Sequence, residues 1–216
     1  MPAFAVFLAA CTLHANPLNT PPFTPVRPVI LVHGLADTSA KLRKMADYLR
    51  SLGWTVYSPT LTPSNGAVGL DQLAKQLEGY IAEHCGKSQP IDLVGYSMGG
   101  IISRYYVQRL GGSRRVRHLV TISSPHHGTW MGYMLGNPGA RQMRPNSDFL
   151  NDLNRNTDAL KQIRFTSIWT PLDLMIIPAN SSHMDFGEED IIWMPAHPLM
   201  VWTPVSWRAV AAALRE

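Results

Sequence analysis

The pentapeptide Gly95-Tyr96-Ser97-Met98-Gly99 directly follows the apolar run 91–94 and precedes the helix-like run 101–110. A serine at such a strand-to-helix junction lies in a sharp turn that only small neighbours permit, and its hydroxyl points out of the sheet. The following helix then directs its positive N-terminal end at that hydroxyl. The pattern is typical of a nucleophile elbow, so Ser97 is the candidate nucleophile. The alternative is a glycine-rich turn with a bystander serine.

Length and composition predict one globular domain. The chain has 216 residues, of which 45% are hydrophobic and 16% are charged, and this length suffices for a sheet covered by helices on both faces. The net charge of +4 does not require a nucleic-acid partner, because no aromatic stacking platform or phosphate-cradling loop accompanies the basic residues. We therefore expect no nucleic-acid partner. A monomer is also expected, with the oligomeric state left open by the sequence. The densest basic stretch is interpreted as a solvated face: Arg104, Arg109, Arg114, Arg115 and Arg117.

The N-terminal residues differ in kind from the rest. Residues 3–10 form an apolar run that is too short to span a bilayer but suits the central region of a secretory signal. The run ends in Leu8-Ala9-Ala10-Cys11, which resembles the site where bacterial lipoproteins are cleaved and lipidated. No Lys or Arg precedes it, which leaves open an upstream start codon or a coincidental apolar start. We predict an export signal over residues 1–11 and a periplasmic, secreted or lipid-anchored protein.

Residues 12–26 contain four prolines and are predicted to be a linker before a single α/β domain over residues 27–216. Cys85, the other cysteine, ends a helical pattern and is interpreted as a half-buried structural residue. Apolar runs that alternate with helix-spaced segments favour a mainly parallel sheet of about six strands with helices on both faces. Strands are expected over 29–32, 54–58, 91–94, 116–122, 165–170 and 190–193. Helices are expected over 42–49 after a Ser39 cap, 70–82, 101–110, about 152–163, and after a Ser206 cap, with a long surface excursion over 123–151.

A serine nucleophile needs a base and an acid, which follow it in the order acid, then histidine, in α/β-hydrolase sites. Five histidines follow Ser97, and His118 is set aside because it follows the elbow only closely. His126 and His127 come directly after a strand with no acid before them, so a structural role is favoured. His197 follows the last predicted strand between small and turn-forming neighbours, which makes it the predicted base. His183 is the rival.

The acid should lie beyond the penultimate strand, where Asp173 follows the predicted strand 165–170. Asp173 is therefore the predicted acid. Four other carboxylates compete, and the last three form a charge run that favours a solvated position at a strand entrance: Asp185, Glu188, Glu189 and Asp190.

The negative charge that develops on the substrate oxygen needs hydrogen-bond donors. One candidate donor is the backbone N–H of Met98, the residue after the nucleophile. The other is the Leu35 N–H in His33-Gly34-Leu35, after the first buried strand. Gly34 lets the backbone turn close to the substrate, and His33 is interpreted as an anchor of this loop rather than a base.

Together, these motifs resemble those of the small bacterial triacylglycerol lipases of the α/β-hydrolase superfamily, over about residues 27–214. The likeness is nearest to the minimal, lid-less type found in bacilli. It rests on Val32-His33-Gly34-Leu35, Gly95-Tyr96-Ser97-Met98-Gly99-Gly100, Ser123-Ser124-Pro125-His126-His127-Gly128, Asp173 and His197. Two features depart from the family pattern. Tyr96 stands where those enzymes commonly carry histidine, and the excursion 132–145 is longer than a minimal enzyme needs, which leaves a small lid open.

The resemblance implies a serine hydrolase that cleaves carboxylic esters with apolar acyl groups through an acyl-enzyme. No His/Cys/Asp cluster has metal-ligand spacing, so no metal or organic cofactor is expected, although a structural calcium as in some larger lipases stays open. An ester or lipid substrate is expected, with association at a membrane surface left open. Apolar surface near the site is expected from Trp130, Met131, Met134, Trp193, Met194, Met200 and Trp202.

Three alternatives stay open at this point. A thioesterase or an acyltransferase would share the same site and differ in the leaving group or in the group that removes the acyl chain. A non-catalytic lipid- or partner-binding module would share only the fold.

Overall fold

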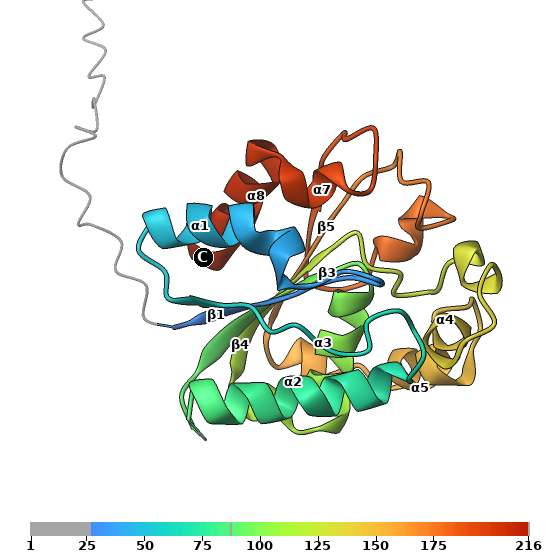
Figure 1. The fold of residues 1–216 in the computed structure, drawn as a ribbon, viewed down its shortest axis with the longest axis horizontal. Helices are drawn as coiled ribbons and strands as arrows, with labels where there is room; N and C mark the ends of the chain where they lie inside the picture. The colour runs from blue at the N-terminus through green and yellow to red at the C-terminus, as the bar shows by residue number, and fades with distance from the viewer. Residues whose placement is uncertain (1–26, 87, 216) are drawn as a thin grey trace, which may run out of the picture.

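The computed structural model describes residues 27–86 and 88–215, so the predicted signal over 1–11 and linker over 12–26 lie outside the described residues. Within these residues, six strands form one sheet in the order β2-β1-β3-β4-β5-β6, and every neighbouring pair is parallel (Figure 1). The predicted α/β fold with a sheet of about six strands is thereby confirmed. The strands are β1 (Val29–Val32), β2 (Val56–Tyr57), β3 (Ile91–Tyr96), β4 (Val116–Ile122), β5 (Arg164–Trp169) and β6 (Glu188–Ile191).

Helices cover both faces of the sheet. In Figure 1, α1, α7 and α8 lie above the sheet, and α2 and α3 lie below it. The α-helices are α1 (Arg43–Ser51), α2 (Leu70–His84), α3 (Met98–Arg109), α4 (Pro138–Gln142), α5 (Asp148–Arg155), α6 (Asp158–Lys161), α7 (Leu199–Trp202) and α8 (Pro204–Arg215). No helix of the described residues is both long enough and apolar enough to cross a membrane.

Strand alternation divides the core into two layers. Successive side chains of β1 point to opposite faces, so Val29 and Leu31 join the cluster that contains the α1 and α8 side chains. Ile30 and Val32 join the cluster formed with α2 and α3. All four residues are fully buried, which explains why β1 is a continuous apolar run rather than an alternating one.

Two predicted helix caps are wrong. Ser39 begins a 3₁₀ turn, η1 (Ser39–Leu42), and its Oγ accepts a hydrogen bond from Thr60 Oγ1 at 2.9 Å. The helix α1 therefore starts at Arg43, after Leu42. Ser206 lies inside α8, which starts at Pro204, a residue whose fixed φ suits a first helical position.

The segment 123–151 was expected to be a surface excursion, and this expectation is wrong. Its first residues are buried, and a 3₁₀ turn, η3 (Trp130–Tyr133), and the helices α4 and α5 follow. Asn137 caps α4 by accepting from the Ala140 N–H at 3.0 Å, and Ser147 caps α5. Residues such as Asn and Ser favour turns and also cap helices, so the sequence pattern alone does not distinguish an irregular loop from the start of a short helix. The helix expected over about 152–163 is divided between α5 and α6.

The charge run Glu188, Glu189 and Asp190 forms most of β6 rather than the entrance to a strand, which corrects the expected position. All three residues are exposed, and they pair with β5 at the edge of the sheet. Charged side chains suit an edge strand because they disfavour pairing with another chain. Glu189 also accepts a hydrogen bond from Trp169 Nε1 at 2.7 Å.

Arg104 corrects the interpretation of the basic stretch as a solvated face. Arg104 is fully buried on α3, whereas Arg114 and Arg117 are exposed. The Arg104 guanidinium donates to Asn154 Oδ1 at 2.9 Å and to the Leu153 carbonyl at 3.3 Å. Burial lowers the pKa of Arg104 to about 9.

Cys85 is buried at the C-terminal end of α2, more deeply than the half-buried position expected. Burial raises the pKa of its thiol, which favours the unreactive protonated form.

Candidate active site

Ser97 connects β3 to α3 in a backbone conformation that serine rarely adopts. Its φ is 53° and its ψ is −122°, and its N–H donates to the Ile122 carbonyl at 2.8 Å. A residue with positive φ that is not glycine costs free energy, and such residues gather at functional sites. The turn holds Ser97 at the C-terminal end of a central strand and at the N-terminal end of a 12-residue helix.

The glycines of the pentapeptide are required by close packing around this turn. A Cβ on Gly95 would lie 2.5 Å from the Gly100 Cα. A Cβ on Gly99 would collide with the Val32 carbonyl oxygen of β1. Gly95 in β3 and Gly99 in α3 therefore allow the helix to pack directly against the backbone of the strands.

Asp173 and His197 meet across the loops that follow β5 and β6. The His197 Nδ1 and the Asp173 Oδ2 lie 2.7 Å apart, and these side chains are only 8% and 1% exposed. The other carboxylate oxygen accepts the Met175 and Ile176 N–H groups, each at 2.9 Å. Burial raises the pKa of Asp173, but the hydrogen bonds from His197 and these two N–H groups outweigh burial and hold it below its usual value. An ionised Asp173 keeps the proton on Nδ1 and leaves Nε2 free to accept one.

Two hydrogen-bonding side chains fix the loop that carries His197. Thr170, at the end of β5, donates to the Met194 carbonyl at 2.8 Å and accepts from the Met194 N–H at 3.1 Å. The Tyr96 hydroxyl donates to the His197 carbonyl at 3.3 Å, and the two ring centroids are 4.9 Å apart. Burial raises the pKa of Tyr96, so the phenol stays a donor. The tyrosine that departs from the family pattern thus supports the histidine loop.

A cavity of about 360 Å³ opens at this end of the sheet, and Ser97 and His197 both line it. Met131 and Met134 contribute to its wall as expected. The other five expected residues do not line it. Met200 is buried in the core, and Trp130, Trp193 and Trp202 are exposed. The fifth is Met194. Further apolar lining comes from Leu135, Met143, Met175 and Ile176, which no motif singled out. The apolar run Leu174 to Ile177 directly after Asp173 is the signal that could have found the last two.

The other histidines have partners away from the cavity. His183 lies 2.7 Å from Glu189 Oε1, and its side chain is 45% exposed. His126 is fully buried and bonds Thr121 Oγ1 through Nε2 at 3.0 Å, which agrees with the expected structural role.

His33 anchors its loop, as expected. Its Nδ1 lies 2.9 Å from the Gly34 carbonyl, and its Nε2 accepts from the Leu61 N–H at 2.9 Å. Burial lowers the pKa of His33, which agrees with a neutral ring that both donates and accepts.

The two expected oxyanion donors belong to segments next to Ser97 in the chain or in the cavity. Met98 is the first residue of α3, and Leu35 lines the cavity. The Ala36 N–H turns away and donates to the Ser64 carbonyl at 2.8 Å, whereas the Leu35 N–H donates no backbone hydrogen bond within the described residues. In the same part of the chain, no three His, Cys, Asp or Glu side chains are grouped so that they could hold a metal ion.

A family model described as the alpha/beta hydrolase fold matches residues 27–168, which is more than half of the chain. The chain belongs to the α/β-hydrolase family. A triacylglycerol lipase from Pseudarthrobacter phenanthrenivorans is 33% identical over 111 residues, covering 47% of this chain and 34% of that protein. The lysosomal thioesterase PPT2 of Bos taurus is 29% identical over 108 residues, covering 48% and 35%. The matched stretch thus spans about a third of the length of each of these relatives.

Solved structures agree with this membership at the level of the fold. The mature form of the Bacillus licheniformis lipase BlEst2 superposes with a TM-score of 0.68 at 16% identity, covering 92% of this chain and 96% of that one. The expected resemblance to α/β-hydrolase lipases and esterases is therefore confirmed for the family.

Proposed function

We propose that this protein is a serine hydrolase that cleaves carboxylic esters with apolar acyl groups. The observation that carries the proposal is the shared cavity: Ser97 and His197 both line it, and His197 is bonded to the buried Asp173. The lipase among the curated relatives agrees with this assignment.

In the proposed reaction, His197 Nε2 removes the proton of Ser97 Oγ as that oxygen attacks the ester carbonyl carbon. The Leu35 and Met98 N–H groups donate to the carbonyl oxygen as it becomes negative. Asp173 stabilises the positively charged imidazole ring. The C–O bond to the alcohol then breaks, and the alcohol takes the proton from His197. A water molecule, deprotonated by His197, attacks the acyl carbonyl carbon. The bond to Ser97 Oγ then breaks, Ser97 takes the proton back from His197, and the acid is released.

The apolar wall of the cavity supports an acyl chain as the group bound there. Methionine side chains adapt to flexible apolar ligands, and four of them line the cavity: Met131, Met134, Met143 and Met175. Burial of each methylene of a chain contributes about 0.8 kcal/mol.

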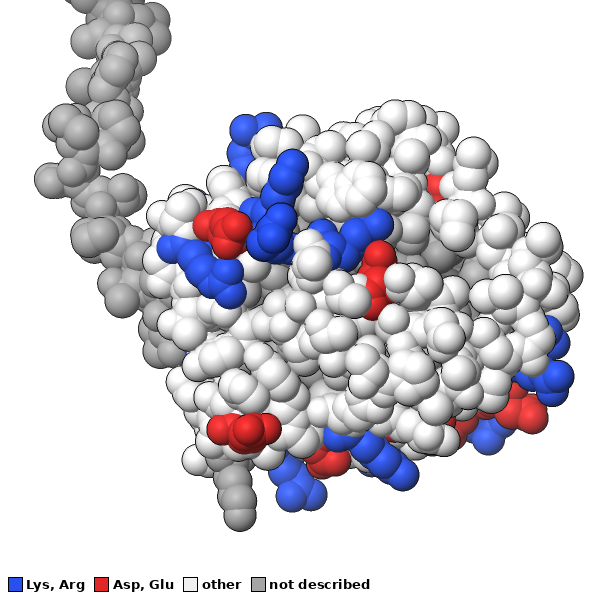
Figure 2. All heavy atoms as spheres, in the orientation of Figure 1, with Lys and Arg blue, Asp and Glu red and all other residues white. Residues whose placement is uncertain are grey.

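Exposed apolar side chains flank the cavity and support the proposed association with a lipid surface. Tyr133 and Met134 are 51% and 73% exposed on one side, and Leu174 is 74% exposed beside Met175 in the loop after Asp173. In Figure 2, the upper right of the molecule, where the loops after β5 and β6 lie, carries almost no charged atoms, whereas charge gathers over α1 and along the lower edge. A surface of this kind favours a lipid aggregate over water.

A thioesterase is the second candidate, because one of the curated relatives is a lysosomal thioesterase. The proposed site would attack a thioester carbonyl by the same steps, so only the leaving group separates the two functions. An acyltransferase would differ in that an alcohol or thiol replaces water in the last step.

A series of p-nitrophenyl esters of increasing acyl length, with p-nitrophenyl thioesters of the same acyl groups, tests the proposal. We expect kcat/KM to rise with chain length until the cavity is full, and the oxygen ester to be preferred at each length. Preference for the thioester would favour the second candidate. Absence of hydrolysis across both series would contradict both functions.

The location of the protein stays a proposal, because the residues that bear on it lie outside the described part. We propose export by residues 1–11, lipidation of Cys11, and a linker over 12–26 that tethers a domain over 27–216. Membrane-bound protein that incorporates labelled palmitate, and a Cys11→Ser variant that does not, would support this. Cytosolic protein that retains Met1 would contradict it.

A further inference from the structure

One wall of the cavity is charged, in contrast to the methionine-lined wall. Asp37 and Lys41 both line the cavity, and Asp37 Oδ1 lies 3.5 Å from Lys41 Nζ. Their side chains are only 21% and 18% exposed. Lys41 Nζ also lies 4.2 Å from the centre of the Trp202 ring, so a cation–π contact helps to hold the pair in place.

The second carboxylate oxygen of Asp37 lies beside the candidate nucleophile. A Cβ built on Gly34 would be 3.2 Å from Ser97 Cβ and 3.3 Å from Asp37 Oδ2, so both atoms border the same point. Within the described residues, Oδ2 accepts no hydrogen bond, whereas Oδ1 faces Lys41. A carboxylate in this place opposes the negative charge that develops on the substrate oxygen, and Lys41 offsets that repulsion. The Asp37 carboxylate is therefore suited to binding part of the substrate rather than to stabilising the negative charge on the substrate oxygen.

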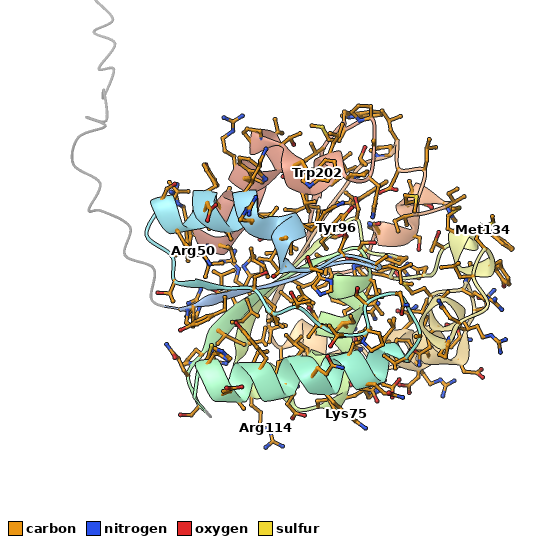
Figure 3. The ribbon with its side chains drawn as sticks, viewed as in Figure 1. Arg50, Lys75, Tyr96, Arg114, Met134 and Trp202 are labelled. Carbon is orange, nitrogen blue, oxygen red and sulfur yellow. The ribbon has the colours of Figure 1, made fainter. Side chains whose placement is uncertain are left out.

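The charged and the apolar walls lie on different sides of the site. Figure 3 shows Tyr96 near the middle of the molecule, Trp202 on the α7 side and Met134 at the far edge. The acyl chain of an ester bound between them would contact the methionines, and its alcohol would face the Asp37–Lys41 pair.

We propose that the Asp37–Lys41 pair is a leaving-group subsite for a neutral alcohol that carries free hydroxyl groups, such as a glycerol ester. Asp37 Oδ2 accepts a hydrogen bond from a hydroxyl next to the ester oxygen, and Lys41 fixes the carboxylate. The pair has no net charge, so it offers a neutral hydroxyl a partner, whereas a phosphate group would be repelled by Oδ2. This inference rests on the proposed ester hydrolysis and names its substrate class.

The test compares two butanoate esters that dissolve in water, so that no lipid surface contributes: monobutanoylglycerol and ethyl butanoate. The readout is the ratio of kcat/KM for monobutanoylglycerol to kcat/KM for ethyl butanoate, in which effects common to both esters cancel. Asp37→Ala should lower the ratio about tenfold or more, because a hydrogen bond to a charged group is lost only with the glycerol ester. Asp47→Ala is the matched control, because it removes an exposed ion pair with Arg50 in α1, away from the cavity, and should leave the ratio unchanged.

A second variant and a third substrate identify the recognised group. Lys41→Met should lower the ratio by less than Asp37→Ala, because the carboxylate that accepts the hydroxyl remains. Asp37→Ala should leave kcat/KM for butanoyl-coenzyme A, which carries phosphates, no lower than in wild type, because it removes the carboxylate that repels them. An unchanged ratio in Asp37→Ala, or a loss of butanoyl-coenzyme A turnover in Asp37→Ala as large as the loss with monobutanoylglycerol, would overturn the subsite while ester hydrolysis stands. Wild type that hydrolyses p-nitrophenyl butanoate but neither of these two esters would overturn the subsite alone, and wild type that hydrolyses no ester of the p-nitrophenyl series would overturn the proposed function with it.

Discussion

Two histidine–carboxylate pairs in this molecule have the same hydrogen-bond length and different surroundings. His197 Nδ1 lies 2.7 Å from Asp173, and His183 Nδ1 lies 2.7 Å from Glu189. The side chains of the first pair are 8% and 1% exposed, and those of the second pair are 45% and 34% exposed. His197 of the first pair lines the cavity that Ser97 also lines, whereas Glu189 of the second pair belongs to the edge strand β6.

The comparison teaches that a short histidine–carboxylate contact does not by itself identify a base. Water competes for the exposed pair and weakens the attraction between its charges, while the buried pair interacts at a lower effective dielectric constant. Only His197 of the two lines the cavity with a serine whose proton it could accept. Burial and the shared cavity therefore separate the two pairs.

The largest expected difference is between the two histidines. His197→Ala should lower kcat for ester hydrolysis by roughly four to six powers of ten, because a nucleophile and its base act as one unit. His183→Ala should change kcat less than about threefold, the effect of an exposed side chain. Steady-state kinetics on one p-nitrophenyl ester decide between them, and the reverse order of the two effects would make His183 the base.

The two carboxylates should differ in the same direction. Asp173→Asn should lower kcat by roughly two to four powers of ten, because the ring of His197 loses the acceptor that sets its tautomer. Glu189→Gln should leave kcat nearly unchanged and is the matched control. Equal losses in the two variants would mean that the buried carboxylate has no special role.

Two arginines of α3 extend the comparison of buried and exposed contacts to stability. Arg104→Ala should lower the free energy of unfolding by about 2–4 kcal/mol, because Asn154 Oδ1 loses its donor and the fully buried side chain leaves a void. Arg109→Ala should cost less than about 1 kcal/mol, because its partner Asp152 is 56% exposed. Urea unfolding of both variants measures the difference, and similar costs would contradict the weight given to burial.

The last comparison concerns acid stability. Burial lowers the pKa of His118 to about 4, so between about pH 6.5 and 4 the unfolded chain binds a proton that the folded chain does not. The free energy of unfolding should therefore fall as the pH falls through this window, by at most about 1.4 kcal/mol per pH unit for this histidine. His118→Gln should flatten the slope measured by urea unfolding, and His84→Gln, an exposed control, should not. An unchanged slope in His118→Gln would contradict the lowered pKa of His118 as a cause of the pH dependence.

Much of the fold could be predicted from the sequence because its signals are local. The run 29–32 is apolar on both faces of the sheet, and the glycines beside Ser97 mark a close approach of backbone to backbone. The residues placed together at the site, Ser97, Asp173 and His197, could be chosen from chain order after strands. Their catalytic roles stay predictions.

The remainder depends on contacts between distant segments. Burial of Arg104 requires the Leu153 carbonyl and Asn154, which are about fifty residues away in the chain. The two cavity walls combine η1, η3 and the loop after β5, so no periodic pattern marks them. Asn137 and Ser147 look like turn residues until the helices that they cap are seen.

The most direct test of the central claim is covalent labelling with a fluorophosphonate, followed by mass spectrometry of the labelled peptide. The phosphonyl group reacts only with a serine whose hydroxyl is activated by a base. The account predicts one label on Ser97 in wild type and none in folded Ser97→Ala. It also predicts strongly slowed labelling in His197→Ala and normal labelling in His183→Ala. Label on another residue, or no label on folded wild-type protein, would contradict the account.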